Sequence, residues 1–243
     1  MKLLFIRHGD PDYSIDSLTE KGWREAKCLA EKMKDVHMDE IYVSPLGRAQ
    51  DTASVTLEKI GRSAITLPWL IEFEPRIHRP DKPEDVLSVA WDWMPDDWTK
   101  HEYFFSDKDW MGHPLFQDSQ VPAKIDWVYS ELDKFLSEHG YVRDGRMYKV
   151  EKANNDTIVF FCHFAVQCVI LSRLLNVSPM VLWHGTCAAP TSVTTVVTEE
   201  RRQGKAYFRM SSYGDVSHLY AAGEPVAFAA RYCECFDNQD ERH

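Results

Sequence analysis

Four basic side chains follow apolar, strand-like runs of the sequence. The first run ends at Arg7 and His8, a second is followed by Arg48, and a third is followed directly by His163. Arginine forks match phosphate oxygens bidentately, and a neutral imidazole can attack phosphorus and form a covalent intermediate. A second, protonated imidazole can steady the equatorial oxygens. Two imidazoles and two guanidinium groups around one anion therefore suit phosphoryl transfer, in which catalysis depends on positioning and electrostatic stabilisation.

Such a reaction also needs a carboxylate near the phosphate. A leaving oxygen requires a proton, and water must later be activated to release the phosphate, and one carboxylate can serve both steps. Glu72 and Glu74, just past a third predicted strand, are the candidates. Gly9 has no Cβ, so the backbone after His8 can turn sharply and let phosphate approach closely. A helix that begins after His163 would point its positive end at the same anion.

The elements that must position these side chains alternate between strands and helices. We expect strands at 2–7, 41–43, 64–67, 157–162, 191–198 and 205–210, and helices at 19–34, after residue 44, at 120–139 and at 164–175. Ser44 is the predicted cap of the second helix, with Pro45 at its first position. Asp144 and Gly145 predict a small hairpin.

The alternation predicts an α/β fold of three layers, with helices on both faces of a central, mostly parallel sheet. Ligands of such sheets bind beyond the carboxyl ends of the strands, where the basic side chains are expected. Residues 69–124 break the pattern. We expect one domain over 1–243, in which 69–124 is an irregular insertion that forms a cap or rim over the cleft. Its tryptophans favour a satellite core beneath a long loop over a stacking surface for substrate. They are Trp69, Trp91, Trp93, Trp98 and Trp110.

Length, charge and composition narrow the class of protein. A chain of 243 residues, 44% of them hydrophobic, suits one large domain with a sizeable core. A net charge of −10 argues against nucleic acid or an anionic membrane as a partner. No apolar stretch reaches the roughly 18 residues of a membrane span, and the N-terminal run is too short for a signal peptide. The spacing of the six cysteines fits neither a zinc ribbon nor a disulfide framework, so a cytoplasmic setting is the simplest inference. The sequence carries no signal for an oligomeric state.

Several other side chains have more than one interpretation. Asp10 and Asp12 suggest a metal site with the histidines, but a turn around the intervening proline is the simpler account. His184 suits the edge of the pocket and an ordinary loop equally well, and His218 is interpreted as structural.

Two further groups remain open. Arg76, His78 and Arg79 follow the candidate acids, and either bind a second anionic group or balance the acidic insertion. Cys233 and Cys235 are a weak redox or metal candidate, and two incidental thiols are the simpler account.

The motifs, taken in order, resemble the histidine phosphatase (phosphoglycerate mutase-like) superfamily in its first branch. Residues 4–9, LFIRHG, resemble its opening signature, and residues 18–22, LTEKG, resemble its Leu-Thr-x-x-Gly helix start. Residues 44–53, SPLGRAQDTA, are close to its Ser-x-Leu-x-Arg-Ala-x-x-Thr-Ala segment. Residues 158–163, followed by a helix, resemble its second catalytic histidine. The order and rough spacing agree from residue 2 to about residue 198, apart from the insertion.

The resemblance implies a role for each matching position. His8 would be the phosphorylated nucleophile, and Arg7, Arg48 and His163 would complete the phosphate pocket. Glu72 would be the proton donor, because residues 70–72, LIE, resemble the family's Leu-x-Glu after the third strand. The substrate would be a small phosphorylated molecule, and neither a metal nor an organic cofactor is implied.

The chain departs from the family's pattern in three places. Phe164 stands where a glycine is common, and Ser14 where an asparagine is frequent. The usual Gly-x-x-Glu-Gly stretch after the acid is replaced by residues 74–77, EPRI. We therefore expect a phosphatase that hydrolyses a phosphomonoester through a phosphohistidine, with a specificity unlike that of the best-known members. The alternatives are a mutase of the same fold and a non-catalytic member that binds phosphorylated ligands or a protein.

Overall fold

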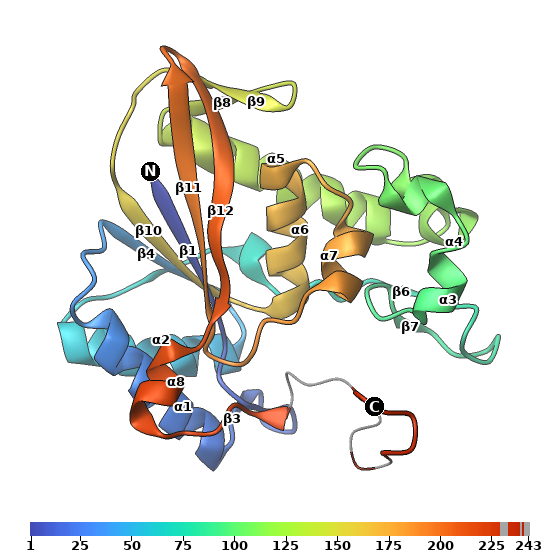
Figure 1. The fold of residues 1–243 in the computed structure, drawn as a ribbon, viewed down its shortest axis with the longest axis horizontal. Coiled ribbons are helices and arrows are strands. Elements are labelled where there is room, and N and C mark those ends of the chain that lie inside the picture. The colour runs from blue at the N-terminus through green and yellow to red at the C-terminus, as the bar shows by residue number, and fades with distance from the viewer. Residues whose placement is uncertain (229–232, 239, 241–243) are drawn as a thin grey trace.

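The strand that leads to His8 lies inside an eight-stranded sheet, in a computed structural model that describes residues 1–228, 233–238 and 240. The strand order is β5-β4-β10-β1-β11-β12-β9-β8 (Figure 1). The parallel part of the sheet consists of β5 (Ile65–Thr66), β4 (Glu40–Val43), β10 (Thr157–Cys162) and β1 (Lys2–Arg7). The antiparallel part consists of β11 (Val193–Arg202), β12 (Lys205–Asp215), β9 (Met147–Val150) and β8 (Tyr141–Asp144).

Helices cover both faces of this sheet. One layer holds α1 (Glu20–Met33), α2 (Gly47–Ile60) and α8 (Ser217–Ala222), and the other holds α5 (Val121–Glu138), α6 (Phe164–Leu175) and α7 (Pro179–Gly185) (Figure 1). Helix α1 packs against α2 and α8, and α6 packs against α5 and α7. The expected three-layer α/β fold is confirmed, and the strands expected to carry the site are its parallel ones.

Strand register brings distant parts of the chain to one edge of the sheet. Arg7 of β1 pairs with Cys162 of β10, and the backbone N–H of His8 donates to the Cys162 carbonyl at 3.0 Å. On the other side of β10, the N–H of Ser44 donates to Phe161 at 2.9 Å. The residues that follow β1, β4 and β10 therefore emerge together at the carboxyl edge.

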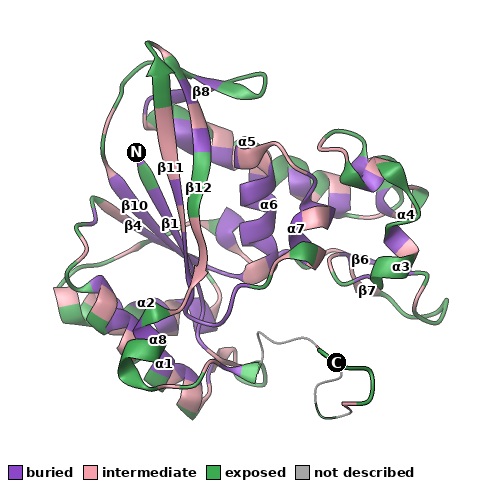
Figure 2. Cartoon of the chain, viewed as in Figure 1, coloured by how far each residue is buried: buried purple, intermediate pink, exposed green. Residues whose placement is uncertain are grey.

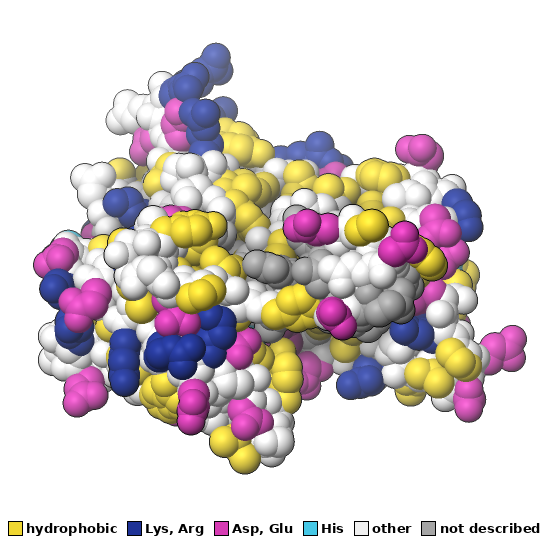
Figure 3. All heavy atoms as spheres, turned by 60° about the horizontal axis from the view of Figure 1, so that its bottom comes forward, with side chains coloured by type: hydrophobic (Ala, Val, Ile, Leu, Met, Phe, Trp, Pro, Cys, Tyr) yellow, Lys and Arg dark blue, Asp and Glu magenta, His cyan; other side chains and the backbone are white. Residues whose placement is uncertain are grey.

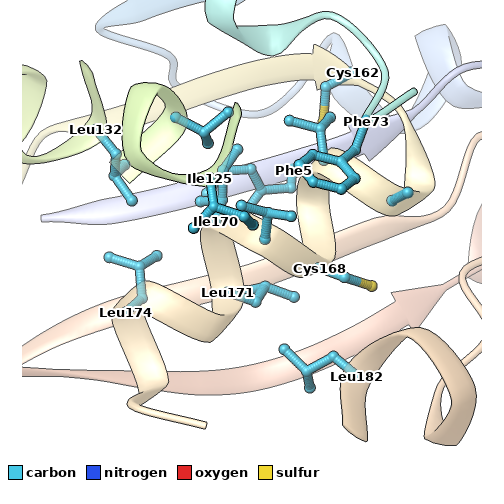
Figure 4. Close-up of a cluster of buried hydrophobic side chains, with 14 of the residues drawn as sticks. Phe5, Phe73, Ile125, Leu132, Cys162, Cys168, Ile170, Leu171, Leu174 and Leu182 are labelled. Carbon is cyan, nitrogen blue, oxygen red and sulfur yellow. The ribbon is translucent and has the colours of Figure 1, made fainter. Parts of the chain in front are cut away.

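Alternate residues of the central strand pack into two separate cores. Leu3 and Phe5 of β1 belong to the core under α5 and α6, whereas Leu4 and Ile6 belong to the core against α1 and α2. The central strands are buried on both faces in Figure 2, and Figure 4 shows Phe5 among side chains of the α5–α6 layer. Burying each such side chain contributes about 1.5–3 kcal/mol, so the strand that leads to His8 is fixed from both faces.

Helix α1 begins where the sequence predicts, but α2 does not. The Thr19 side chain accepts a hydrogen bond from the N–H of Gly22 at 3.0 Å and caps α1. Helix α2 starts at Gly47, so the prediction that Ser44 caps it, with Pro45 in its first turn, is wrong. The Ser44 hydroxyl is instead hydrogen-bonded to a buried histidine, described below.

Other boundaries shift by a few residues. The strand expected at 64–67 shortens to β5, whereas the last two expected strands extend into the long hairpin of β11 and β12. The predicted hairpin at Asp144 and Gly145 is present as β8 and β9, with Gly145 at φ 59°. A further pair, β2 (Pro11–Asp12) and β3 (Ser17–Leu18), follows the site loop.

The segment 69–124 consists of short elements beside α5 and α7 (Figure 1). They are η1 (Pro68–Leu70), β6 (Arg76–Ile77), β7 (Ser88–Val89), α3 (Pro95–Trp98), η2 (Glu102–Phe105), η3 (Trp110–Gly112) and α4 (Pro114–Gln117). Trp69, Trp93, Trp98 and Trp110 are buried, and they join the α5–α6 core rather than forming a separate one. The expectation of a satellite core is therefore wrong, because these rings continue the main core. None of the helices in the described part of the chain is long and apolar enough to cross a membrane.

Candidate active site

The four basic side chains singled out in the sequence lie together at the carboxyl edge of the sheet. The rings of His8 and His163 are 5.1 Å apart between centroids, at 54° to each other. Arg7 ends β1, Arg48 lies in the first turn of α2, and all four residues are at most 9% exposed. The arrangement places two guanidinium groups and two imidazoles in one buried cluster.

The hydrogen bond of His8 fixes which ring nitrogen is reactive. Nδ1 lies 2.7 Å from the Gly9 carbonyl oxygen, and because a carbonyl only accepts, Nδ1–H is the donor. The lone pair is therefore on Nε2. Burial lowers the pKa of His8 well below its usual range, and the neighbouring Arg7 guanidinium lowers it further. His8 is consequently a neutral imidazole with an available Nε2 at neutral pH.

Among the described residues, only one ring nitrogen of His163 has a hydrogen-bond partner. Its Nε2 lies 2.7 Å from the Ser44 hydroxyl, while its buried Nδ1 has no hydrogen-bond partner among the described residues. Burial, and then the nearby His8 and Arg48, lower the pKa of His163 well below its usual range. An anion placed between these groups would act in the opposite direction and favour a protonated His163.

Each arginine is anchored by one end of its guanidinium group. Arg7 donates from Nη1 to the Ala188 carbonyl at 2.6 Å, and Arg48 donates from Nη1 to Asp16 Oδ1 at 2.5 Å. The Nε atoms of both arginines are buried without a hydrogen-bond partner in the described part of the chain. Unpaired buried donors are costly, so these groups are suited to an anionic ligand.

Asp16 is a residue that the sequence did not reveal. Besides Arg48, its carboxylate accepts from the N–H of Gly47 at 2.7 Å, so it supplies the cap of α2 that was expected from Ser44. A Cβ on Gly47 would lie 2.1 Å from the Asp16 carbonyl oxygen, so this close approach requires glycine. No motif around Asp16 pointed to this contact.

The loop after His8 is hydrogen-bonded to side chains of both neighbouring helices, α1 and α2. The N–H of Gly9 donates to the Thr52 hydroxyl at 2.9 Å, and the N–H of Asp10 donates to Glu25 at 2.9 Å. A Cβ on Gly9 would lie 2.9 Å from the Gly22 carbonyl oxygen. Glycine is therefore required here because this backbone packs against α1. We had expected glycine for a different reason, the close approach of phosphate.

Hydrogen bonds from Thr191 hold the backbone of Arg7 and His8. The N–H of Thr191 donates to both of their carbonyl oxygens at 3.1 Å, and Thr191 adopts φ 59°, an unusual conformation for a residue other than glycine. The Thr191 hydroxyl is 3.0 Å from Nε2 of His218. Burial lowers the pKa of His218 to about 4. His218, expected to be structural, is thus hydrogen-bonded to the residue that holds the end of β1.

We expect His218→Ala to lower kcat by about 10- to 100-fold, because small displacements of reacting groups are that costly. The substitution removes one of the two partners of the Thr191 hydroxyl, the other being the Pro190 carbonyl, and so loosens the residue whose N–H holds the His8 backbone. Steady-state kinetics and thermal denaturation should be measured together, with the exposed His37→Ala as control. A destabilised variant with unchanged kcat would show that His218 contributes to folding alone.

Of the two candidate acids, Glu72 is the one that reaches the basic cluster. Its carboxylate accepts from the N–H groups of Phe73 at 2.8 Å, Val166 at 3.0 Å and Ala165 at 3.5 Å. Burial raises the pKa of Glu72, although these donors and Arg7 act in the opposite direction. Glu74, two residues on, is exposed.

The position of Glu72 changes the expected role of α6. We expected the first turn of that helix to face the anion directly. The N–H groups of Ala165 and Val166 in that turn instead bind the Glu72 carboxylate. The helix therefore acts on the site through the acid that it holds.

The remaining candidate residues have structural partners. His184 bridges α7 and the insertion, because its Nε2 accepts from the N–H of Trp93 at 3.0 Å. Asp12 accepts from the Ser14 N–H at 3.0 Å, as in a turn, and Asp10 accepts from the Thr19 hydroxyl at 2.7 Å.

The described contacts of Arg79 and Cys233 are with residues of their own segments. Arg79 is paired with Asp81 and, at 3.2 Å, with Asp92. Cys233 donates to the Cys235 carbonyl at 2.9 Å. Over residues 1–228, 233–238 and 240, no cluster of three His, Cys, Asp or Glu is placed to hold a metal ion.

Comparison with known proteins finds similarity to phosphatases and phosphoglycerate mutases. The family model of the histidine phosphatase superfamily (branch 1) matches residues 3–108, which include Arg7, His8, Arg48 and Glu72. Phosphoserine phosphatase 1 of Hydrogenobacter thermophilus is 26% identical over 212 residues, covering 83% of this chain and 89% of the relative. A 2,3-bisphosphoglycerate-dependent phosphoglycerate mutase of Thermoplasma acidophilum is 33% identical, but over 79 residues, 28% of this chain and 40% of the relative.

Solved structures support the fold. A phosphoserine phosphatase mutant from Entamoeba histolytica, in complex with phosphoserine, superposes with a TM-score of 0.58. The match covers 90% of this chain and 98% of the other at 21% sequence identity. At that identity the likeness concerns the architecture of the sheet and its helices. The family model over residues 3–108, the relative matched along most of its length and the shared architecture make this chain similar to branch 1 of the histidine phosphatase superfamily.

Proposed function

We propose that this protein hydrolyses a small phosphomonoester through a phosphohistidine formed on His8. The observation that carries the proposal is the state of that ring: a neutral imidazole whose Nδ1 is bonded to Gly9, leaving Nε2 free beside two arginines. Two relatives matched over most of their length are named phosphoserine phosphatase 1 and adenosylcobalamin/alpha-ribazole phosphatase.

In the first step, Nε2 of His8 attacks phosphorus in line with the ester oxygen. A nitrogen–phosphorus bond forms, the phosphorus–oxygen ester bond breaks, and the leaving oxygen takes the proton of Glu72. Arg7 and Arg48 neutralise the equatorial oxygens, and His163 donates from Nδ1 when it is protonated. The raised pKa of Glu72 supports this role, because a proton donor must hold its proton near the working pH.

In the second step, water releases the phosphate. The Glu72 carboxylate, now deprotonated, takes a proton from water as the water oxygen attacks phosphorus. The nitrogen–phosphorus bond breaks and its electron pair returns to Nε2, so the enzyme regains its starting protonation state. One carboxylate serves as acid and then as base.

Glu72→Gln is expected to lower kcat by roughly 10²- to 10⁴-fold, the usual range for a positioned acid–base group. The pH profile provides the sharper test. His8 reacts when neutral, so its lowered pKa places the acid limb below the usual range of histidine. Glu72 must be protonated in the first step, so its raised pKa places an alkaline limb above the usual range of carboxyl groups. The pH dependence of kcat/KM should lose the alkaline limb in the variant, and an unchanged profile would exclude Glu72 as the donor.

The direct test of the proposed reaction is a panel of phosphomonoesters screened for release of inorganic phosphate. Release by the wild-type protein and not by the His8→Ala variant supports the hydrolase. Transfer of the phosphoryl group to a second hydroxyl without release would identify a mutase. Tight binding of phosphorylated ligands with no turnover would identify a non-catalytic member.

Location and partners form part of the same proposal. Cys28, Cys162, Cys168, Cys233 and Cys235 are free thiols, which suits a reducing cytoplasm. Acidic and basic side chains are interspersed over the face shown in Figure 3, and the net charge of −10 favours a small substrate over nucleic acid. The segment 69–124, which supplies Glu72, is proposed to form the rim of the substrate cleft.

A further inference from the structure

A buried carboxyl group lies beside the loop after His8 and takes no part in the proposed reaction steps. Glu25 of α1 is 0% exposed, and its Oε2 accepts from the N–H of Asp10 at 2.9 Å. Its Oε1 has no hydrogen-bond partner among the described residues. Burying a carboxyl group with one oxygen unpaired costs folding free energy. An apolar side chain would fill the same space without that cost, so the carboxyl group at this position points to a function.

The hydrogen bond of Glu25 leads to the nucleophile through a single peptide group. The N–H of Asp10 and the carbonyl of Gly9 belong to that peptide, and the carbonyl oxygen accepts from Nδ1–H of His8 at 2.7 Å. In a trans peptide the N–H and the C=O point in opposite directions, so the peptide lies between the carboxyl group and the imidazole ring. We call this chain of two hydrogen bonds, from Glu25 through the Gly9–Asp10 peptide to His8, the peptide relay.

Helix α1 approaches the loop closely enough to make this contact. A Cβ on Gly22 would lie 2.2 Å from the Asp10 carbonyl oxygen, so the close approach requires glycine. Glu25 is three residues after Gly22 and therefore lies on the same face of the helix. The N–H of Thr19, the cap of α1, donates to the same Asp10 carbonyl at 3.0 Å. The start of α1 and the loop therefore hold Glu25 in a fixed position relative to His8.

Burial has the largest influence on the ionisation of Glu25. On its own helix, Lys21 Nζ lies 3.5 Å from Oε1, but it also pairs at 3.0 Å with Glu224, which follows α8. Asp10 accepts from the Thr19 hydroxyl at 2.7 Å. The elements packed against α1 contribute charged side chains that have partners of their own, namely Arg48 with Asp16, Asp51 with Ser17 and His218 with Thr191. Burial raises the pKa of Glu25 to about 7, although the Asp10 N–H and Lys21 lower it.

We propose that Glu25 is a positioning residue for the nucleophile, whose carboxylate acts through the peptide relay to keep the His8 proton on Nδ1 and to raise the electron density on Nε2. The proposal rests on the phosphatase function proposed above. A negative charge at the N–H end of a peptide polarises the group and makes its carbonyl oxygen a stronger acceptor. That oxygen attracts the Nδ1 proton more strongly, which makes the opposite ring nitrogen a better nucleophile. Only the ionised carboxyl group has this effect, so the rate of attack by His8 should rise with pH through about 7.

The kinetic test uses p-nitrophenyl phosphate, because its phenolate leaves without a proton from Glu72. With this ester, kcat/KM reports the attack of His8 and the formation of phosphohistidine. Glu25→Gln keeps an acceptor for the Asp10 N–H and removes the charge. Since a charged acceptor binds a donor roughly fivefold to tenfold more strongly than a neutral one, kcat/KM at about pH 8 should fall about three- to tenfold. The rise through about pH 7 should disappear, and inhibition by inorganic phosphate should not change, because the groups around the anion are intact.

Two further variants complete the comparison. Glu25→Met removes the acceptor as well as the charge, so the peptide is no longer held and kcat/KM should fall about 10- to 100-fold, as small displacements of reacting groups do. Glu31→Gln removes a carboxylate of the same helix whose side chain is 57% exposed, and should leave the rate and its pH dependence unchanged.

Thermal unfolding separates the relay from a role in folding. Because its pKa is raised, ionisation of Glu25 opposes folding above the usual range of carboxyl groups. Glu25→Gln removes this buried charge, so at about pH 8 it should unfold at a temperature no lower than that of the wild type. A residue with a purely structural role would lose activity only together with stability.

A spectroscopic signature tests the relay without turnover. In protein labelled with ¹⁵N-histidine, the Nδ1–H proton of His8 is identified by its absence from His8→Ala. Its resonance should move downfield as Glu25 ionises, with a midpoint at about pH 7. This titration should be absent from Glu25→Gln and kept in Glu31→Gln.

The outcomes separate this inference from the proposed function. The relay would be overturned by a His8 titration that persists in Glu25→Gln, by a wild-type kcat/KM in that variant, or by a loss of activity that only follows a lower unfolding temperature. The hydrolase would stand in each of those cases. Absence of phosphate release from every ester would instead overturn the phosphatase proposal, and the His8 resonance would still decide whether Glu25 acts on that ring.

Discussion

Replacing His8 with alanine is expected to lower phosphatase turnover by roughly 10⁴-fold or more, as loss of a covalent nucleophile does in other enzymes. Nε2 of this ring carries a lone pair close to Arg7 and Arg48, and we expect no neighbouring group to replace it in the attack. Initial rates of phosphate release with p-nitrophenyl phosphate measure the loss. Acid-labile, alkali-stable labelling of the protein by a phosphate donor should disappear in the same variant.

The control for this variant is a surface histidine. His37→Ala removes an imidazole whose side chain is 84% exposed, and should leave the rate and the labelling unchanged. Because His8 is 2% exposed, its replacement leaves a small cavity, so circular dichroism must show that the variant is folded. A folded His8→Ala protein that keeps its rate would exclude the phosphohistidine mechanism.

The second large effect is expected from Arg48. Arg48→Ala should lower kcat/KM by about 10²- to 10³-fold, since a donor directed at developing charge contributes about 3–4 kcal/mol. Its guanidinium is held by Asp16 at 2.5 Å, and the carboxylate of Asp16 is itself fixed by the first turn of α2. Inhibition by vanadate, which imitates the pentacoordinate phosphorus, should weaken by a similar factor.

Arg24→Ala is the matched control for Arg48. It removes a guanidinium from the outer surface of α1, where Arg24 pairs with Glu224 at 3.1 Å. An intact vanadate affinity in Arg48→Ala would show that the guanidinium does not contact the anion. Asp16→Asn adds a finer measure, because it keeps a cap for α2 and removes the charge that orients Arg48.

The sequence alone located the basic cluster because its members sit where strands end. A buried strand shows as an apolar run, and the parallel pairing of β1 with β10 then places His8 beside His163. Glu72 was identified by resemblance to the family. The hydrogen bonds that hold its carboxylate at the first turn of α6 became visible only in the structure.

The contacts made by short polar side chains could not be predicted. Ser44 and Pro45 form a plausible helix start by local rules, yet the buried ring of His163 takes the Ser44 hydroxyl, and Asp16 caps α2 from a distant loop. The support of Thr191 by His218 joins residues 27 positions apart, in a backbone conformation that no residue preference indicates. Tertiary hydrogen bonds of this kind override local preference because a buried polar group must find a partner.

The hydrogen bonds between Glu72 and the first turn of α6 have a consequence for which parts of the sequence can vary. The carboxylate is pinned by the N–H groups of Ala165 and Val166, which belong to the helix after His163, and by that of the adjacent Phe73. Changes beyond Phe73 that keep the buried tryptophans in the core would therefore leave the Glu72 carboxylate, the proposed proton donor, at the start of α6. We expect that exposed loops of this segment can change in sequence while the proposed proton donor keeps its place.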